Sequence, residues 1–281
     1  MPNVLSKEKR VQVVSCLVEG NSIRATVRLT GVAKNTVVRL LAGVGRASLI
    51  YQDQAFRGLT CKKLQCDEVW SFVGAKEKNT TKETKAKGWG DCWIWTALDA
   101  ETKLIPCWYF GTRDAGAALH FMHDLAARLA HRVQLTTDGH KPYLTAVADA
   151  FGGDIDYATL TKIYGEGPKT EARYSPAQCM GALKAVVSGS PEHKHVSTSF
   201  VERHNLTIRM GNRRFTRLTN AFSKKVENHE HMLALFFMYY NFFRVHQSLR
   251  VTPAIEANIA RKIWEISDIV DLLSDTELMA A

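Results

Sequence analysis

The sequence has few of the features that mark disulfide-bonded or zinc-stabilised domains. Its 281 residues include six cysteines, which lie far apart without any Cys-x-x-Cys pair. This spacing predicts reduced core cysteines rather than a disulfide framework or a structural zinc site. No apolar run is long enough to cross a bilayer, and no secretory signal pattern is present, so we expect a cytoplasmic protein without a membrane partner.

Acidic residues are also scarce relative to basic ones. The chain has 37 Lys and Arg against 28 Asp and Glu, which gives a formal net charge of +9. A basic balance favours a polyanionic partner, with nucleic acid ahead of a membrane surface. Hydrophobic residues make up 46% of the sequence, enough for the core of one large domain or two smaller ones.

Residues 1–47 predict a small helical DNA-binding domain. Two amphipathic helices follow Ser22 and meet at a tight turn on Gly31, the layout of a helix-turn-helix. This segment contains eight Lys and Arg against two Glu. The second helix offers residue types that reach base edges and phosphates in a major groove: Lys34, Asn35, Thr36 and Arg39.

Residues 48–63 predict a connector, because Gly58 and several polar residues interrupt any regular pattern. A catalytic domain is then expected over 64–250. Its elements are expected as strands at 64–73, 89–98 and 104–110, a helix at 114–129, a strand at 133–137, a helix from Pro142 and a strand at 155–163. This order predicts an α/β fold with a ribonuclease-H-like mixed five-stranded sheet and flanking helices.

The later part of the chain changes in character. Residues 165–200 predict a long insertion with little regular structure, and 251–281 predict a C-terminal helical tail. Between them, residues 203–226 hold seven Lys and Arg and no acid, which predicts a second cationic face. The residues expected to hold DNA phosphates there are Arg209, Arg213, Arg214, Arg217, Lys224 and Lys225.

Three carboxylates are candidates for catalysis. Asp67 lies on the first expected strand, Asp138 ends the fourth, and Glu202 lies on a later helix. In the expected sheet these elements are neighbours, so the three side chains would converge. Their oxygen atoms would then bind a hard cation, Mg²⁺ or Mn²⁺. Three converging carboxylates are expected to bind two ions about 3.5–4 Å apart, an arrangement used in phosphoryl transfer.

Each carboxylate also has an alternative interpretation. Glu68 could be the ligand instead of Asp67, and strand alternation turns these two to opposite faces, so only one is expected to serve. Asp138 precedes Gly139, a pair that is often a simple turn. Glu202 lies three residues after Ser199, which fits a capping box.

Four sequence blocks resemble the catalytic domain of transposases of the insertion-sequence-one family: DEVWSFVG at 67–74, TDGHKPY at 137–143, VERHNL at 201–206 and FSKKVENH at 222–229. The resemblance implies a prokaryotic, nucleoid-associated DDE transposase, acting on double-stranded DNA as a homodimer or higher oligomer. It carries Asp67, Asp138 and Glu202 over as the catalytic triad. The cysteine-rich element usual before the helix-turn-helix in that family is missing here.

Other functions remain open from the sequence. A helix-turn-helix regulator with an inactive, domesticated body and a structure-specific nuclease would share most of these features. His193 and His195 with Tyr239 and Tyr240 suggest the nickases that use two histidines and a tyrosine nucleophile, but Lys194 separates the histidines where an apolar residue is expected. A zinc site from Cys179, His193, His195 and His204 lacks close ligand spacing.

Overall fold

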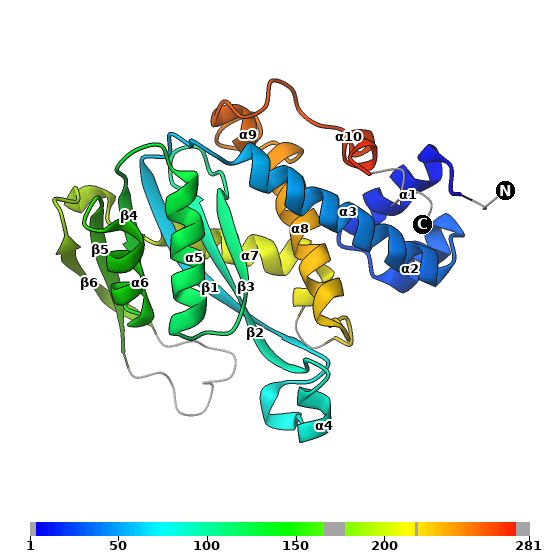
Figure 1. Cartoon of the computed structure of the whole chain (residues 1–281), viewed down its shortest axis with the longest axis horizontal. Helices are drawn as coiled ribbons and strands as arrows, with labels where there is room; N and C mark the ends of the chain where they lie inside the picture. Colours follow the sequence, from blue (N-terminus) through cyan, green and yellow to red (C-terminus); the bar gives the residue numbers. More distant parts are fainter. Residues whose placement is uncertain (1–3, 166–177, 217–218, 274–281) are drawn as a thin grey trace.

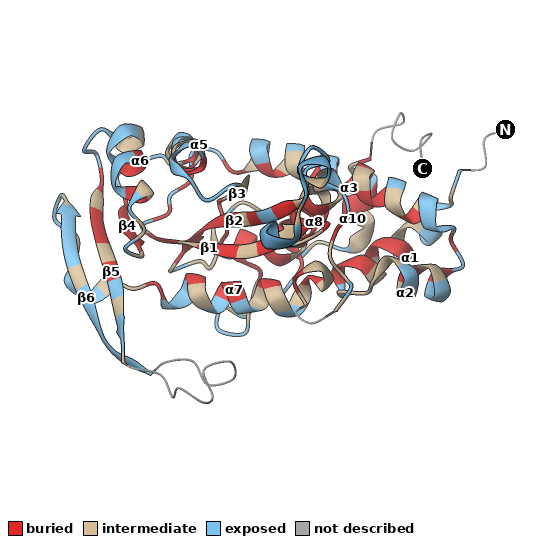
Figure 2. Cartoon of the chain, turned by 90° about the horizontal axis from the view of Figure 1, so that it is seen from below, coloured by how far each residue is buried: buried red, intermediate tan, exposed pale blue. Residues whose placement is uncertain are grey.

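The computed structural model describes residues 4–165, 178–216 and 219–273. It is a mixed α/β protein built around a six-stranded sheet (Figure 1). Helices α5 (Ala115–Arg128) and α6 (Pro142–Phe151) cover one face of the sheet, and α7 (Ser199–Gly211) crosses the other (Figure 2). Buried residues line the layers between these elements, whereas the strand farthest from the N-terminal helices is largely exposed.

The sheet has the strand order β3-β2-β1-β4-β5-β6. The strands are β1 (Lys63–Val73), β2 (Gly90–Asp99), β3 (Cys107–Gly111), β4 (Gln134–Thr137), β5 (Asp156–Tyr164) and β6 (Cys179–Ser188). Strand β1 is central, antiparallel to β2 and parallel to β4, while β5 is parallel to β4. The five expected strands are therefore present, with the first strand in the centre and the fourth beside it.

Strand β6 is the element that the sequence did not predict, so the five-stranded expectation was wrong by one strand. It pairs antiparallel with β5 and lies inside the segment 165–200, where only 182–187 was expected to be ordered and no strand was assigned. Most of its residues are exposed, including Met180 and Leu183. Without a buried face, the strand has no apolar alternation that would reveal it.

The N-terminal helices are α1 (Lys7–Val18), α2 (Ile23–Thr30) and α3 (Lys34–Ala55). Ser22 caps α2 through a hydrogen bond from the Ala25 amide, and Gly31 ends it with a left-handed φ of 71°. Helix α3 is longer than predicted, because the first half of the expected connector 48–63 is helical. Its Gln52 is buried and donates through Nε2 to the carbonyl of Ala234, 3.2 Å away.

That carbonyl belongs to α8 (Val226–Phe242), which runs beside α3 (Figure 1). The two helices approach closely at Gly45, where a Cβ atom would lie 2.5 Å from Cβ of His231. On its other side α8 packs against the sheet, with Leu233 and Phe237 in one cluster with Val69 of β1. Helix α8 therefore joins the N-terminal helices to the sheet.

The remaining helices are short. Helix α4 (Lys82–Lys85) lies in the projecting connection between β1 and β2, and α9 (Pro253–Glu256) and α10 (Ile266–Asp271) form the C-terminal segment. Helix α10 returns to α1, where Lys7 Nζ and Asp271 Oδ1 form an ion pair of 2.6 Å. Its Ile269 and Val270 are buried in the cluster that also contains Val14 and Leu17.

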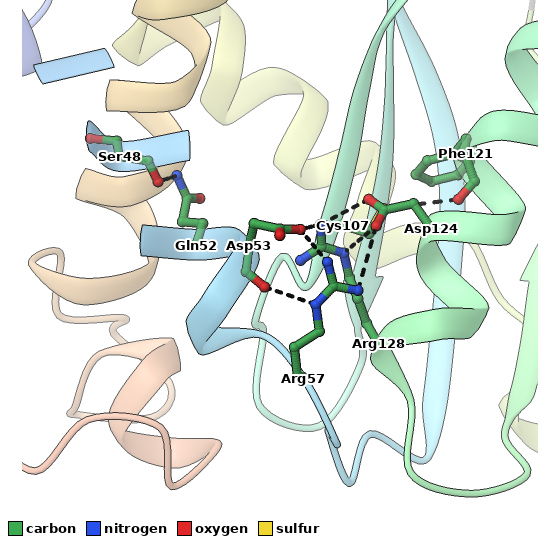
Figure 3. Close-up of polar contacts among 8 residues, drawn as sticks. All are labelled: Ser48, Gln52, Asp53, Arg57, Cys107, Phe121, Asp124 and Arg128. Carbon is green, nitrogen blue, oxygen red and sulfur yellow. Dashed lines mark hydrogen bonds and ion pairs between the residues drawn. The ribbon is translucent and has the colours of Figure 1, made fainter. Parts of the chain in front are cut away.

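A group of charges fastens α3 to α5 (Figure 3). The Arg128 side chain is only 9% exposed, and its Nη2 lies 2.9 Å from both Asp53 Oδ1 on α3 and Asp124 Oδ2 on α5. Arg57 pairs with Asp53, and the Cys107 thiol lies 3.2 Å from Asp124 Oδ2. A cavity of about 410 Å³ opens beside this group, between α3, β3, α5 and α8.

The prediction of core cysteines holds for four of the six, whereas Cys16 is partly exposed and Cys179 is exposed. All six are free thiols, and Cys61, Cys66, Cys92 and Cys107 are buried. Within the described ranges, no helix combines the length and the apolar character that crossing a bilayer requires.

Candidate metal centre

The site forms where two parallel strands diverge. The last paired residues of β1 and β4 are Cys66 and Thr137. Asp67 and Asp138 are the next residues along the two chains, so they lie beside each other at the end of the ladder. Carboxylate oxygens of Asp67, Glu68 and Asp138 lie within 4.8 Å of one another. In the part of the chain that is described, this is the one group of three or more acidic, histidine or cysteine side chains close enough to share a metal ion.

Asp67 faces α7. Its Oδ2 accepts a hydrogen bond of 2.7 Å from Asn205 Nδ2, and its Oδ1 accepts one of 2.8 Å from the Glu68 amide. Burial raises the pKa of Asp67 to about 6, and the neighbouring charges of Asp138 and Glu202 act in the same direction. Asn205 thus holds one oxygen of Asp67 in place, a role that the sequence did not reveal.

Glu68 belongs to the group although it turns to the opposite face of β1 from Asp67. Its side chain is 1% exposed, Oε2 accepts a hydrogen bond of 3.1 Å from Arg113 Nε, and the buried Tyr143 hydroxyl lies close enough to the carboxylate to act against the rise in its pKa. Burial raises its pKa to about 7. Asp67 and Glu68 turn to opposite faces as strand alternation predicted, toward Asn205 and Arg113 respectively, but β4 ends at Thr137, so oxygens of both acids still lie within 4.8 Å of the Asp138 carboxylate.

Asp138 occupies a tight turn, as the Asp-Gly pair indicated. Its Oδ1 accepts a hydrogen bond of 2.9 Å from the His140 amide. A Cβ atom at position 139 would lie 2.7 Å from Thr161 Oγ1, so glycine is needed for the turn to approach β5. Turn and candidate ligand are therefore compatible, since the Asp138 carboxylate accepts this bond and also has an oxygen within 4.8 Å of oxygens of Asp67 and Glu68.

Glu202 lies on α7 outside this three-acid group. Its Oε1 accepts a hydrogen bond of 2.7 Å from Thr198 Oγ1, and its Oε2 forms an ion pair with Lys162 of β5. The expected capping box with Ser199 is not formed, because the helix begins after Thr198. Glu202 nevertheless lies near enough to raise the pKa of Asp67.

The predicted DNA-reading residues lie on the first two turns of α3, directly after the Gly31 turn. Lys34, Asn35 and Arg39 are exposed, and Thr36 is partly exposed. This surface is accessible to a large ligand.

The second set of predicted DNA contacts is divided. Lys224 and Lys225 are exposed, while Arg209 and Arg213 are partly exposed. Arg214 instead points inward: Nε donates to Ser223 Oγ at 2.6 Å, and burial lowers its pKa to about 10. Ser223 also contacts His229 Nδ1 at 3.2 Å, so Arg214 helps to order this loop. Arg217 lies outside the described residues.

The alternative histidine and tyrosine sites have structural explanations. Tyr240 Oη donates to the carbonyl of Lys103 at 3.0 Å, and Tyr239 Oη donates to Glu19 at 2.8 Å. His204 is buried beside Tyr240, and burial lowers its pKa to about 3. These contacts tie the side chains to the packing of α7 and α8.

Comparison with known proteins identifies no relative: no protein-family model and no curated protein matches the chain.

Proposed function

We propose that this chain is a DDE transposase, an enzyme that uses divalent metal ions to cut DNA at the ends of a mobile element and join those ends to target DNA. The observation that carries the proposal is the meeting of Asp67, Glu68 and Asp138, whose oxygens lie within 4.8 Å of one another. Burial raises the pKa of two of these acids, Asp67 to about 6 and Glu68 to about 7. A cation would compensate that burial.

The topology supports a ribonuclease-H-like sheet. Strand β1 is central, β4 lies beside it in parallel, and α7 packs across them with Asn205 and Glu202 toward the acids. Strand β6 extends that sheet beyond its five-stranded form.

The donor set fits Mg²⁺ or Mn²⁺. Asp67, Glu68 and Asp138 offer hard oxygen atoms, with Glu202 as the next carboxylate. When bound there, such ions would lower the pKa of a water molecule or a 3′-hydroxyl and would neutralise charge on the phosphate. The chain itself contributes orientation: Asn205 fixes Asp67, and Arg113 fixes one oxygen of Glu68.

Double-stranded DNA is the proposed substrate, with α2 and α3 acting as a helix-turn-helix. The exposed side chains of Lys34, Asn35 and Arg39 support recognition of the element ends, and Lys224 and Lys225 support contact with phosphates. Since two ends must be joined, we propose that the chain acts as a homodimer or higher oligomer.

A strand-transfer assay tests the proposal, with the DNA on both sides of the gene as donor, a supercoiled plasmid as target, and Mg²⁺ or Mn²⁺. Wild type should yield joined products. Asp67→Asn and Asp138→Asn should yield none, while the control Asp53→Asn, an acid outside the site, should retain activity. Equal activity of Asp138→Asn and wild type would contradict a catalytic metal site.

One observation favours a second function, a DNA-binding regulator with an inactive sheet domain. Glu202, the third acid of the expected triad, is held by Lys162 and Thr198. Specific binding to the flanking DNA without any metal-dependent cleavage would support this function instead.

A further inference from the structure

A strip of aromatic side chains lies beside the acids, on the same face of β1 as Glu68. We define the aromatic strip as Trp70, Phe72, Trp93 and Phe222. Trp70 and Phe72 alternate with buried residues along β1, and Trp93 of β2 pairs directly with Trp70, so it shares that face. The rings of Trp70 and Phe72 are 5.7 Å apart, and those of Phe72 and Phe222 are 5.0 Å apart.

The aromatic strip is not part of the core. All four of its residues are partly exposed. By contrast Trp95, two residues beyond Trp93 on the same face, is 0% exposed and is covered by Phe121 of α5 and Tyr143 of α6. The cover that α5 and α6 provide therefore ends at Trp95, and the sheet continues past them toward the α4 connection (Figure 1).

Cations accompany the aromatic strip. The guanidinium of Arg113 lies 4.7 Å from the Trp93 ring centroid, and Nζ of Lys76 lies 5.5 Å from that of Trp70. Lys224 and Lys225 follow Phe222 and are exposed. Aromatic faces among mobile cations are the composition of surfaces that bind unpaired nucleic-acid strands, where bases stack and phosphates meet Lys or Arg.

Arg113 connects the aromatic strip to the site, since it stacks on Trp93 and also donates to Glu68. Trp70 follows Glu68 by two residues on the strand, a separation of about 6.6 Å. A DNA strand with its phosphate at the acids would thus carry its neighbouring bases over Trp93 and Trp70.

We propose that the aromatic strip binds unpaired bases of the DNA strand next to the reacting phosphate. This inference rests on the proposed function, because it takes the three acids as the place where the phosphate lies. In a duplex the faces of each base are stacked on the neighbouring base pairs, so the aromatic strip selects DNA that is single-stranded or locally opened. The basic surroundings favour this ligand over an apolar protein partner.

Binding of fluorescein-labelled oligonucleotides, measured by anisotropy in EDTA, tests the inference. The double variant Trp70→Leu/Trp93→Leu keeps apolar side chains but removes both aromatic faces. Its affinity for a single-stranded 20-mer should fall about tenfold or more, with less than a twofold change for the same sequence as a duplex. Trp70→Phe/Trp93→Phe should stay within about threefold of wild type, because phenylalanine can still stack.

Trp264→Leu is the matched control, since Trp264 is also partly exposed but packs on Tyr51 and Phe242 far along the chain. It should bind single strands as wild type does. Unchanged single-strand binding by Trp70→Leu/Trp93→Leu, or equal losses of affinity for single strand and duplex, would overturn the inference.

Photocrosslinking of wild type to a single strand containing 5-iododeoxyuridine gives a second test that needs no variant. Crosslinks should map to residues of the aromatic strip, and crosslinks confined to other residues would overturn the inference. Neither measurement needs a metal ion. Failure of this inference can therefore be distinguished from failure of the proposed metal site or of strand transfer.

Discussion

Two charged groups in this protein are built in opposite ways. Arg128 is a buried cation, 9% exposed, and its neighbours are the oppositely charged Asp53 and Asp124. Glu68 is a buried anion, 1% exposed, and its neighbours include the like-charged Asp67 and Asp138, with Arg113 as the counterion. In the first group each charge lowers the energy of the next, whereas in the second the acids repel one another.

This difference separates a structural group from the proposed metal site. The Arg128 group joins α3 to α5, and opposite charges within about 4 Å favour one another. The acids at Asp67 have raised pKa values, as expected for carboxylates that are buried together without enough cation. Proteins retain such an arrangement where a bound ion or a reaction needs it.

Neutralising the partners should therefore have opposite effects in the two groups. Asp53→Asn/Asp124→Asn leaves the Arg128 charge buried without an anion, and should destabilise the protein by about 3 kcal/mol or more. Asp67→Asn/Asp138→Asn removes repulsion around Glu68, and should leave metal-free stability unchanged or higher. Urea unfolding in EDTA measures both, and equal losses in the two double variants would contradict the distinction.

The two groups should also differ in their dependence on pH. The folded pKa values of Asp67 and Glu68, about 6 and about 7, lie above the unfolded values near 4. The stability they contribute is therefore fully present below about pH 4 and is lost as pH rises through 6 to 7. We expect a loss of about 4 kcal/mol between pH 5 and pH 8 in EDTA.

Asp67→Asn/Glu68→Gln should flatten that loss, because neither replacement titrates. Asp53→Asn, which belongs to the Arg128 group, should keep the slope of wild type. A wild-type unfolding free energy that is constant from pH 5 to pH 8 would show that the acids are not held at raised pKa values.

Glu202→Gln should cause the smallest change in stability of these variants. The amide oxygen can still accept from Thr198, but the ion pair with Lys162 is lost, and partly exposed pairs of this kind contribute little. We expect a change within about 1 kcal/mol, together with loss of strand transfer, because an amide is a poor ligand for Mg²⁺. Normal strand transfer by Glu202→Gln would remove it from the catalytic set.

The sequence predicted the sheet order well, because β1 to β5 have buried faces and short or helical connections. It missed β6 and the second half of α3. The exposed residues of β6 show no apolar alternation, and in α3 the polar residues Ser48 and Gln52 interrupt the helical periodicity of apolar residues. Asp67 and Asp138 were predicted as neighbours from strand order alone. Glu68 and the Lys162–Glu202 pair depend on where β4 ends and on a side chain from β5, which are tertiary facts.

Asp67, Glu68 and Asp138 are proposed to hold a divalent ion. Titration with Mn²⁺ at pH 7.5, followed by electron paramagnetic resonance of free Mn²⁺, tests it directly without DNA. Wild type and Asp53→Asn should bind Mn²⁺ alike, and Asp67→Asn/Asp138→Asn should lose that binding. Wild type without saturable Mn²⁺ binding, or a double variant that binds as wild type does, would contradict the claim.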